Sequence, residues 1–376
     1  MTTYMAGRVV TPEEVLDEGW VQVTDGRIGR IGGRHDGMPA DGEPPVVLGD
    51  MTIVPGFVDI HTHGGGGATY STTDAEEARR AADFHAQHGT TTTMASLVTA
   101  SLDDLVAQTA CLADLVTDGV LGGVHLEGPF LSAARCGAHD PALLRNPVEG
   151  DVAKVLSDAV RMVTIAPELP GGLDAIRQVV EAGVVAALGH TDASYDEMVA
   201  GADAGATVAT HLFNGMRPFH HRDPGPVGAA LNDPRLLLEV INDGFHLDPQ
   251  VVRVALNAAG TERIALITDA MVATGLADGR YKIGDLDVDV VSGEARLTTG
   301  ERSIAGSTLT MDVAFANAVR AGVSLVDATR MASTTPAATF GWAEVGAIET
   351  GRRADLVVLD DDLAVQRVMR AGMWLP

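Results

Sequence analysis

Eight short apolar segments alternate with amphipathic helical segments through most of this 376-residue chain. The apolar segments have the length and residue content of buried strands, and they are residues 53–63, 89–97, 121–130, 160–168, 184–191, 206–214, 236–246 and 263–271. Apolar residues at helical spacing recur between them, for example in residues 74–89, 102–119, 172–183, 194–205 and 248–260. Because strands that alternate with helices form parallel sheets, we predict an α/β fold built on a (β/α)₈ TIM-like barrel.

The two ends of the chain carry a different pattern. Residues 7–33 and 347–375 alternate apolar and polar positions and contain glycine turn signals, which indicates short antiparallel strands. Chain ends often lie close together, so we expect both ends to build one small β-sandwich domain. The predicted boundaries are residues 1–53 and 336–376 for the β-domain and residues 54–335 for the barrel. Residues 280–302 predict a β-hairpin inserted before the last barrel helix.

Charge and cysteine content restrict the environment and the partners. The formal net charge of −25 repels nucleic acid and anionic membranes, so we expect neither as a partner. Two cysteines, Cys111 and Cys136, cannot form a disulfide framework in a chain of this length, which favours the reducing cytoplasm. The first residues lack a basic segment followed by an apolar run, and no apolar run reaches about 18 residues, so we expect neither a signal peptide nor a membrane span.

Six ionisable residues lie at the ends of predicted strands. His61 and His63 share one face of the first barrel strand, because residues two apart in a strand point to the same side. The set comprises His61, His63, Glu127, His190, His211 and Asp269. The carboxyl ends of barrel strands meet at one rim, where active sites lie, and imidazole and carboxylate groups bind zinc and similar cations. One such histidine is usually structural, but the whole set predicts a metal centre.

The lysine content indicates which residue bridges two cations. Many two-metal hydrolases with this barrel use a carboxylated lysine on a strand. This chain has only Lys154, in a helical segment, and Lys282, in the predicted hairpin. We therefore expect Glu127 to be the bridge, since a carboxylate offers two oxygens. His125 precedes it on the same face of the strand, and we assign it to barrel packing or to support of the ligands.

Several motifs together resemble the N-acetylglucosamine-6-phosphate deacetylase family of the amidohydrolase superfamily. They are PGFVDIHTHG, HLEGPF followed by GAHDP, LGHTDA, THLFNGMRPFHHRDPG, NDGFHLDP, LITDAM and IAGSTLTMD. The resemblance extends over essentially the whole chain, to the closing GRRADLVVLD. The HxH pair and ADLVVLD are common to the superfamily, whereas HLEGPF with GAH, THLFNGM and NDGFH are more specific to the deacetylase.

The resemblance implies a metal-dependent hydrolase that converts N-acetylglucosamine 6-phosphate into glucosamine 6-phosphate and acetate, in amino-sugar catabolism and cell-wall recycling. Glu127, His190 and His211 would hold the cation common to the family. His61 and His63 would complete a second site, so we expect two divalent cations per subunit. Zinc is the first choice, with iron, manganese or cobalt as alternatives.

The resemblance also assigns residues to the substrate. Asp269 would be the catalytic acid/base, and His139 would polarise the acetyl carbonyl. Arg222 would pair with the phosphate, because a guanidinium matches phosphate bidentately. His246 would contact the sugar or phosphate, in this family across a dimer interface, and a homodimer is expected. The remaining substrate contacts would be Ala138, Asn214, Gly215, Ile304, Ala305 and Gly306.

Three alternative interpretations stay open. The substrate could be the galactosamine epimer, because a single stereocentre leaves no trace in these motifs. Another amidohydrolase, such as a dihydroorotase-like or deaminase-like enzyme, also fits the HxH pair, although the lack of a strand lysine and the presence of Glu127 argue against it. A non-catalytic protein on a decayed barrel would have lost some of the six residues. Cys136 is interpreted as a plain loop cysteine, and His220 and His221 as solvated loop residues, either of which could instead help to bind an anion.

Overall fold

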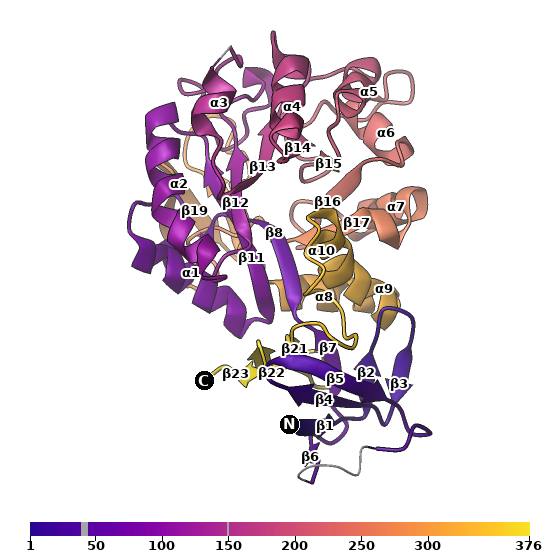
Figure 1. Ribbon diagram of the computed structural model, residues 1–376. Coiled ribbons are helices and arrows are strands. Elements are labelled where there is room, and N and C mark those ends of the chain that lie inside the picture. Colours follow the sequence, from indigo (N-terminus) through magenta and orange to yellow (C-terminus); the bar gives the residue numbers. More distant parts are fainter. Residues whose placement is uncertain (39–43, 149) are drawn as a thin grey trace. The chain divides into compact units, whose positions relative to one another are not determined.

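The computed structural model describes residues 1–38, 44–148 and 150–376. Its largest sheet has eight strands, and neighbours in the sheet are also neighbours along the chain (Figure 1). In order they are β8 (Phe57–Thr62), β11 (Thr90–Val98), β12 (Gly123–Glu127), β13 (Val160–Ile165), β14 (Val185–Leu188), β15 (Val208–Ala209), β16 (Leu237–Ile241) and β17 (Ile264–Ile267). The ladders from β11 to β17 are parallel. Strand β17 is buried along its whole length, which explains its continuous apolar sequence IALI.

The sheet closes at the carboxyl ends of its first and last strands. The N–H of Asp269 donates to the carbonyl of His61 at 2.9 Å, and the N–H of His63 donates to the carbonyl of Ala270 at 2.8 Å. These bonds join β8 to the residues that follow β17. The predicted TIM-like barrel is therefore confirmed, and its carboxyl ends form one rim.

Helices follow the strands, as the alternation in the sequence predicts. They are α1 (Ala75–Gln87), α2 (Leu102–Thr117), α3 (Asp151–Val155), α4 (Gly172–Glu181), α5 (Tyr195–Asp203), α6 (Gly225–Asn232), α7 (Pro249–Ala259), α8 (Met311–Arg320), α9 (Leu325–Thr329) and α10 (Thr335–Thr339). Local chemistry sets several of their starts. Ser194 and Glu197 form a capping box at α5, and Asp248 caps α7 just before Pro249. No helix in the described residues is long and apolar enough to cross a membrane.

Both chain ends contribute to a β-sandwich. One sheet contains, in order, β5 (Arg27–Gly32), β4 (Trp20–Thr24), β1 (Thr2–Met5) and β6 (Val46–Val47). The other contains β23 (Met373–Trp374), β22 (Val365–Arg370), β21 (Leu356–Leu359), β7 (Thr52–Pro55), β2 (Arg8–Val10) and β3 (Val15–Asp17). Val21 and Ile28 from the first sheet share one apolar core with Val9, Ile53 and Leu356 from the second. The predicted second domain from both termini is thus confirmed.

The residues group into two compact units. One contains Met1–Asp59, His85–Thr92 and Thr310–Pro376, and the other contains Ile60–Phe84 and Thr93–Leu309. The sandwich belongs to the first unit, and all the strand-end residues that the sequence singles out belong to the second. The predicted domain boundaries after residues 53 and 335 remain predictions.

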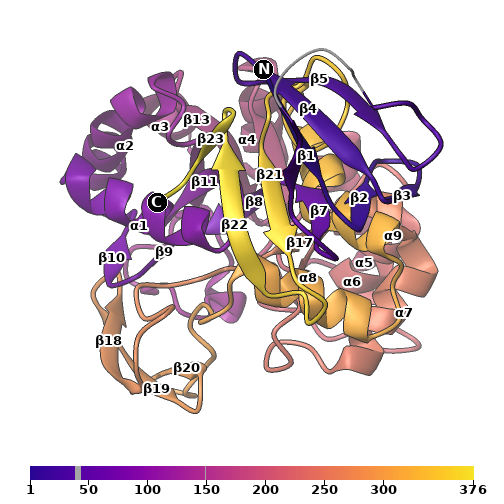
Figure 2. The same cartoon turned by 90° about the horizontal axis from the view of Figure 1, so that it is seen from below.

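The inserted segment is a small antiparallel sheet with one strand more than a hairpin (Figure 2). It consists of β18 (Gly279–Ile283), β19 (Leu286–Val291) and β20 (Glu294–Leu297). Ile283, Val288 and Ala295 pack with Met271 and Val98 in a second apolar cluster. This cluster fixes the sheet to the part of the chain that follows β17. A two-stranded ribbon of β9 (Gly64–Gly65) and β10 (Ala68–Thr69) follows β8.

Candidate active site

The first group of convergent side chains comes from the two strands at which the barrel closes. His61 and His63 lie at the end of β8, and Asp269 follows β17. The Nε2 atoms of the two histidines are 3.3 Å apart. Asp269 Oδ1 lies 3.2 Å from His63 Nε2 and 3.6 Å from His61 Nε2. All three residues are buried, and the structure places their ligand-type atoms where one cation could touch them all.

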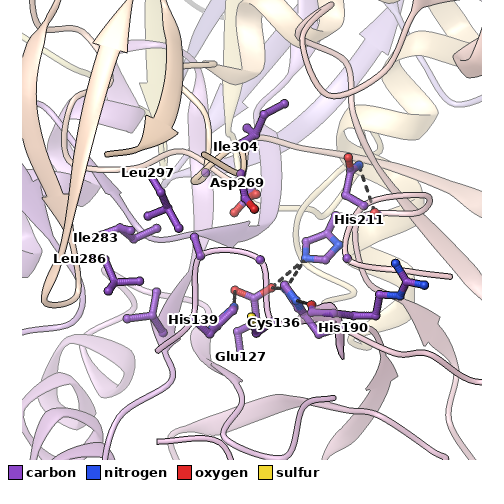
Figure 3. A pocket seen from close by; sticks show the side chains of 18 of the residues that line it. Glu127, Cys136, His139, His190, His211, Asp269, Ile283, Leu286, Leu297 and Ile304 are labelled. Atoms are coloured by element: carbon purple, nitrogen blue, oxygen red, sulfur yellow. Dashed lines mark hydrogen bonds and ion pairs between the residues drawn. The ribbon is translucent and has the colours of Figure 1, made fainter. Parts of the chain in front are cut away.

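The second group draws one side chain from each of three strands. Glu127 ends β12, His190 follows β14 and His211 follows β15. Glu127 Oε1 lies 3.1 Å from His190 Nε2 and 2.9 Å from His211 Nε2, and the two nitrogens are 3.0 Å apart (Figure 3). The group forms because parallel strands deliver their carboxyl ends to the same rim.

Glu127 faces both groups at once. Its Oε1 meets His190 and His211, while its Oε2 lies 3.1 Å from His63 Nε2 and 3.5 Å from His61 Nε2. The carboxylate is 3 % exposed. A carboxylate with one oxygen toward each group has the geometry of a bridge between two cations.

Hydrogen bonds behind the imidazoles fix their tautomers. His63 Nδ1 lies 3.0 Å from the carbonyl of Ser96, and His190 Nδ1 lies 2.8 Å from the carbonyl of Arg135. A carbonyl only accepts, so each Nδ1 carries the hydrogen and each neutral ring has its lone pair on Nε2. These lone pairs point at carboxylate oxygens, which are also acceptors. Acceptors that face acceptors in a buried place fit a metal cation between them.

The electrostatics of the cluster also call for positive charge. Burial lowers the pKa of His63, but hydrogen bonds with Asp269 and Glu127 outweigh burial and raise that pKa to about 9. Burial opposes the ionised form of Asp269, yet contact with His63 and the nearby His61 hold its pKa well below the ordinary value. The carboxylates thus draw protons onto the imidazoles, and a divalent cation would supply the same charge.

His139 presents a hydrogen-bond donor to the same place. Its Nδ1 accepts from the backbone N–H of Thr99 at 3.3 Å, so the proton of the neutral ring is on Nε2, which lies 3.4 Å from Glu127 Oε2. Burial, and then the neighbouring His190, lower the pKa of His139 to about 4, so the ring is neutral at pH 7. His139 can therefore donate one hydrogen bond toward the cavity without carrying a charge.

A cavity of about 560 Å³ opens beside these groups. His63, Glu127, His139, His190, His211 and Asp269 line it. On another side it is bounded by the apolar residues Ile283, Leu286 and Leu297 of β18–β20 (Figure 3). A volume of this size suits a small-molecule ligand, with polar chemistry on one wall and apolar surface on the other.

The sequence model of the amidohydrolase family matches residues 52–375 of the chain. The chain belongs to the amidohydrolase family. It is 36% identical to the N-acetylglucosamine-6-phosphate deacetylase of Vibrio furnissii, over 87% of this chain and 84% of that protein. It is also 36% identical to the N-acetylgalactosamine-6-phosphate deacetylase of Escherichia coli O157:H7, over 98% and 97% of the two chains. The solved N-acetyl-D-glucosamine-6-phosphate deacetylase of Mycobacterium smegmatis is 47% identical, with a TM-score of 0.95 and full coverage of both chains.

Three of the strand-end residues of this amidohydrolase adopt a left-handed backbone. The φ angles are 46° at His190, 28° at His211 and 50° at Asp269. A residue with a Cβ is strained in this region by roughly 1–3 kcal/mol, and such strain gathers at functional sites. Each left-handed residue lies just after the last residue of its strand, where the chain turns at the rim. Histidine and aspartate enter this region more often than most residues with a Cβ, so the residue types permit the conformation without predicting it.

Most of the residues that the sequence assigns to the substrate lie at the cavity of the amidohydrolase. Those lining it are Ala138, Asn214, Gly215, His246, Ile304 and Gly306. Arg222 and Ala305 are not among the lining residues: Arg222 is exposed, with Nη1 2.7 Å from His221 Nε2, and Ala305 is fully buried. Of the ambiguous residues, Cys136 lines the cavity, whereas His220 and His221 are exposed and pack ring against ring.

His125 and Lys154 behave as the sequence predicts. His125 is fully buried, and its ring nitrogens contact Ser96 Oγ at 2.9 Å and Thr164 Oγ1 at 2.8 Å. Its ring packs edge-on against His61, at 4.6 Å between centroids, so it supports the site from below. Lys154 pairs with Asp103 at the surface, 2.7 Å away, and takes no part in the site.

One buried residue of the amidohydrolase site was missed by sequence reasoning. Glu239 lies in the middle of β16 and has no exposed surface. Its Oε2 lies 3.0 Å from His61 Nδ1. The signal was present in the sequence, because Glu239 is a lone charge inside the apolar run LLLEVI. Charged residues are rarely buried without a partner, so this residue needed a function or an ion pair.

Proposed function

We propose that this amidohydrolase is a metal-dependent deacetylase that hydrolyses N-acetylglucosamine 6-phosphate to glucosamine 6-phosphate and acetate, in amino-sugar catabolism and cell-wall recycling. The observation that carries the proposal is the shared carboxylate of Glu127, which faces two convergent groups of ligand-type atoms beside the donor of His139. The deacetylase names of the similar proteins support the substrate class.

The residues fit two divalent cations. Glu127, His190 and His211 would hold one, and His61, His63 and Asp269, with Glu127 as the bridge, would hold the other. Imidazole and carboxylate ligands suit zinc first, and also iron, manganese or cobalt. Cations held here supply Lewis acidity, which acidifies water and polarises a carbonyl oxygen.

Asp269 carries the proton in this proposal. Its carboxylate remains ionised at neutral pH, since burial is outweighed by His63 and His61, so it can accept a proton from the attacking water. The water oxygen bonds to the acetyl carbon, the C–N bond breaks, and Asp269 returns the proton to the departing amine nitrogen. The acetic acid that results gives its remaining proton to the amine, so the products are acetate and the ammonium form of the amino sugar, and Asp269 is again a carboxylate.

His139 stabilises the oxygen on which negative charge develops. Its tautomer is set by the N–H of Thr99, so Nε2–H is available as a donor. Donors of this kind contribute roughly 3–4 kcal/mol to the lowering of the barrier in other acyl-transfer sites. Because the ring is neutral at pH 7, the donor function does not depend on protonation of His139.

The sugar would occupy the cavity, with its ring toward Ala138, Asn214 and Gly215. We propose that Arg222 and His246 receive the phosphate. Arg222 belongs to an exposed loop and does not line the cavity of its own chain. We further propose that the protein is a cytoplasmic homodimer, in which the second copy places these residues at the phosphate end of the sugar.

Acetate release tests the function directly. The protein is incubated with N-acetylglucosamine 6-phosphate, with its galactosamine epimer, and with nucleobases as a probe of deamination, before and after chelation. We expect acetate from the glucosamine substrate, loss of turnover with chelator, and recovery on addition of zinc. Faster turnover of the epimer would change the substrate within the deacetylase class. Ammonia from a nucleobase, or full activity in chelator, would contradict the proposal.

A further inference from the structure

A buried carboxylate touches one residue of each group in the active site. Glu239 Oε2 lies 3.0 Å from His61 Nδ1 and accepts a hydrogen bond from the backbone N–H of His211 at 3.1 Å. The side chains of Glu239 and His61 are 0 % exposed. Strand β17 lies between β16 and the closing strand β8, so Glu239 contacts a residue that its own strand does not pair with.

The imidazoles of the site differ in what holds them from behind. The rings of His63 and His190 donate to main-chain carbonyls, which are neutral and which no substitution removes. His61 Nδ1 instead meets the side chain of Glu239, which carries a charge. His211 Nδ1 has no hydrogen-bond partner among the described residues, and the backbone of His211 is held by the same Glu239.

Burying the carboxylate of Glu239 is costly unless its charge is compensated by a partner. Transfer of an ionised carboxylate into the protein interior costs several kcal/mol when it is not compensated. No arginine or lysine in the described ranges forms an ion pair with Glu239; its ion-pair partner there is His61. The side chain lies in an otherwise apolar strand, whose neighbouring residues Leu238 and Val240 are also fully buried. The polar contacts of the Glu239 carboxylate are therefore with His61 and His211 of the active site.

We propose that Glu239 is a positioning residue for the second cation site. By accepting from His61 Nδ1, it holds that ring in the tautomer whose Nε2 lone pair faces His63 and Asp269, and it adds negative charge behind the ligand. Metal-ligating histidines elsewhere depend on such carboxylates for orientation and basicity. The inference rests on the proposed two-cation function, and it assigns to this chain one side chain on which the second cation depends more than the first.

Cation content separates the two sites. Wild-type protein and the Glu239→Gln variant are loaded with zinc, passed through gel filtration and measured by elemental analysis, and cation affinities are obtained by competition with a chelator. We expect two cations per chain in the wild type and one in Glu239→Gln, with the affinity for the second lowered roughly 10–100-fold. Anomalous scattering from crystals should place the retained cation at Glu127, His190 and His211. Glu262→Gln, which removes an exposed carboxylate, should retain both cations.

A His61→Asn background tests whether the effect passes through His61. That variant should hold one cation, and adding Glu239→Gln should remove nothing more. Two cations at wild-type affinity in Glu239→Gln would overturn the inference, as would an equal loss of the first cation in either background. If Glu239→Gln does not fold by circular dichroism, Glu239→Asp takes its place, and its shorter carboxylate should give an intermediate affinity for the second cation; wild-type affinity there would overturn the inference. A wild type without any cation would instead refute the proposed function.

Discussion

Two buried aspartates show how differently the two compact units use the same side chain. Asp355, in the unit that contains the sandwich, accepts from Arg353 Nε with both oxygens, at 3.0 and 2.9 Å, and from the backbone N–H of Ala371 at 2.8 Å. Asp269, at the barrel rim, has His63 at 3.2 Å and His61 at 3.6 Å as its ion-pair partners among the described residues. The side chain of Asp355 is 2 % exposed and that of Asp269 is 10 % exposed.

The side chain that pairs with each carboxylate decides whether its negative charge remains available to a proton or a cation. A guanidinium is permanently charged, so the fold itself neutralises Asp355 and uses it for stability. Imidazole is neutral or charged according to its surroundings, so the charge of Asp269 is left for a proton or a cation. A buried acid without a permanent cation therefore marks a functional site more strongly than burial alone does.

The largest expected effect follows from replacing Asp269 by Asn. An amide cannot accept and return a proton, so turnover should fall by about 10²- to 10⁴-fold. The cation held by Glu127, His190 and His211 should remain, as elemental analysis would show. Metal-free Asp269→Asn protein should unfold at a lower temperature than the wild type, because the contacts with His63 and His61 that hold the pKa of Asp269 low also stabilise the folded state at neutral pH. Acetate release at the wild-type rate would refute the proposed role.

The same substitution at Asp355 should lower stability instead of turnover. Asp355→Asn leaves Arg353 without its charged partner, so the free energy of unfolding should drop by about 1–3 kcal/mol in a urea titration. The loss is smaller than for a fully buried pair, because Arg353 remains 27 % exposed and can reach water. Turnover per folded molecule should not change. If Asp355→Asn lost activity without losing stability, the contrast between the two aspartates would fail.

The barrel could be predicted because its physics is repetitive. Parallel strands covered on both faces are mostly apolar along their length, so a strand such as β17 stands out as an apolar run. The topology then forces the strand ends to one rim, which is why residues as distant as His61 and Asp269 could be placed together. The prediction was weakest where a strand is short: residues 206–214 contain a strand of only Val208–Ala209.

Contacts across the barrel interior could not be predicted. Glu239 reaches His61 over a separation of 178 residues, and no spacing rule links a residue on β16 to one on β8. Residue type alone did not predict the left-handed backbone at His190 and Asp269, because histidine and aspartate are only enriched in that region and the tertiary fold selects it. The compact unit that contains the terminal sheets also includes α8 and α9, which the sequence assigned to the barrel of residues 54–335.

Arginines extend the comparison. Arg222 is exposed and forms no ion pair with a carboxylate of residues 1–38, 44–148 or 150–376, whereas Arg353 is occupied by Asp355. If Arg222 receives the phosphate, Arg222→Ala should raise KM for the phosphorylated substrate about tenfold, since a charge-assisted hydrogen bond contributes roughly 1.5–3 kcal/mol. KM for unphosphorylated N-acetylglucosamine should not change. Arg235→Ala, which removes an arginine paired with Asp233 and Asp203, is the control.

The smallest expected effect tests whether a histidine partner is enough to make a buried aspartate functional. Asp312 belongs to the unit that contains the sandwich, and its Oδ2 lies 3.3 Å from His88 Nδ1. Burial raises the pKa of Asp312, but hydrogen bonds with His88 and Thr310 outweigh burial and lower it below the ordinary value. The folded pKa is therefore below the unfolded one, so the stabilisation is present above about pH 4 and is lost as the pH falls through the folded pKa.

Asp312→Asn should accordingly lower the free energy of unfolding by no more than about 1 kcal/mol at pH 7, because His88 is partly exposed. The difference from the wild type should shrink toward pH 3, which denaturant titrations across that range would measure. Turnover should be unchanged, since Asp312 has one imidazole and no second ligand group beside it in the described residues. A loss of turnover comparable to that of Asp269→Asn would show that the convergence of several ligands is not what separates the two regions.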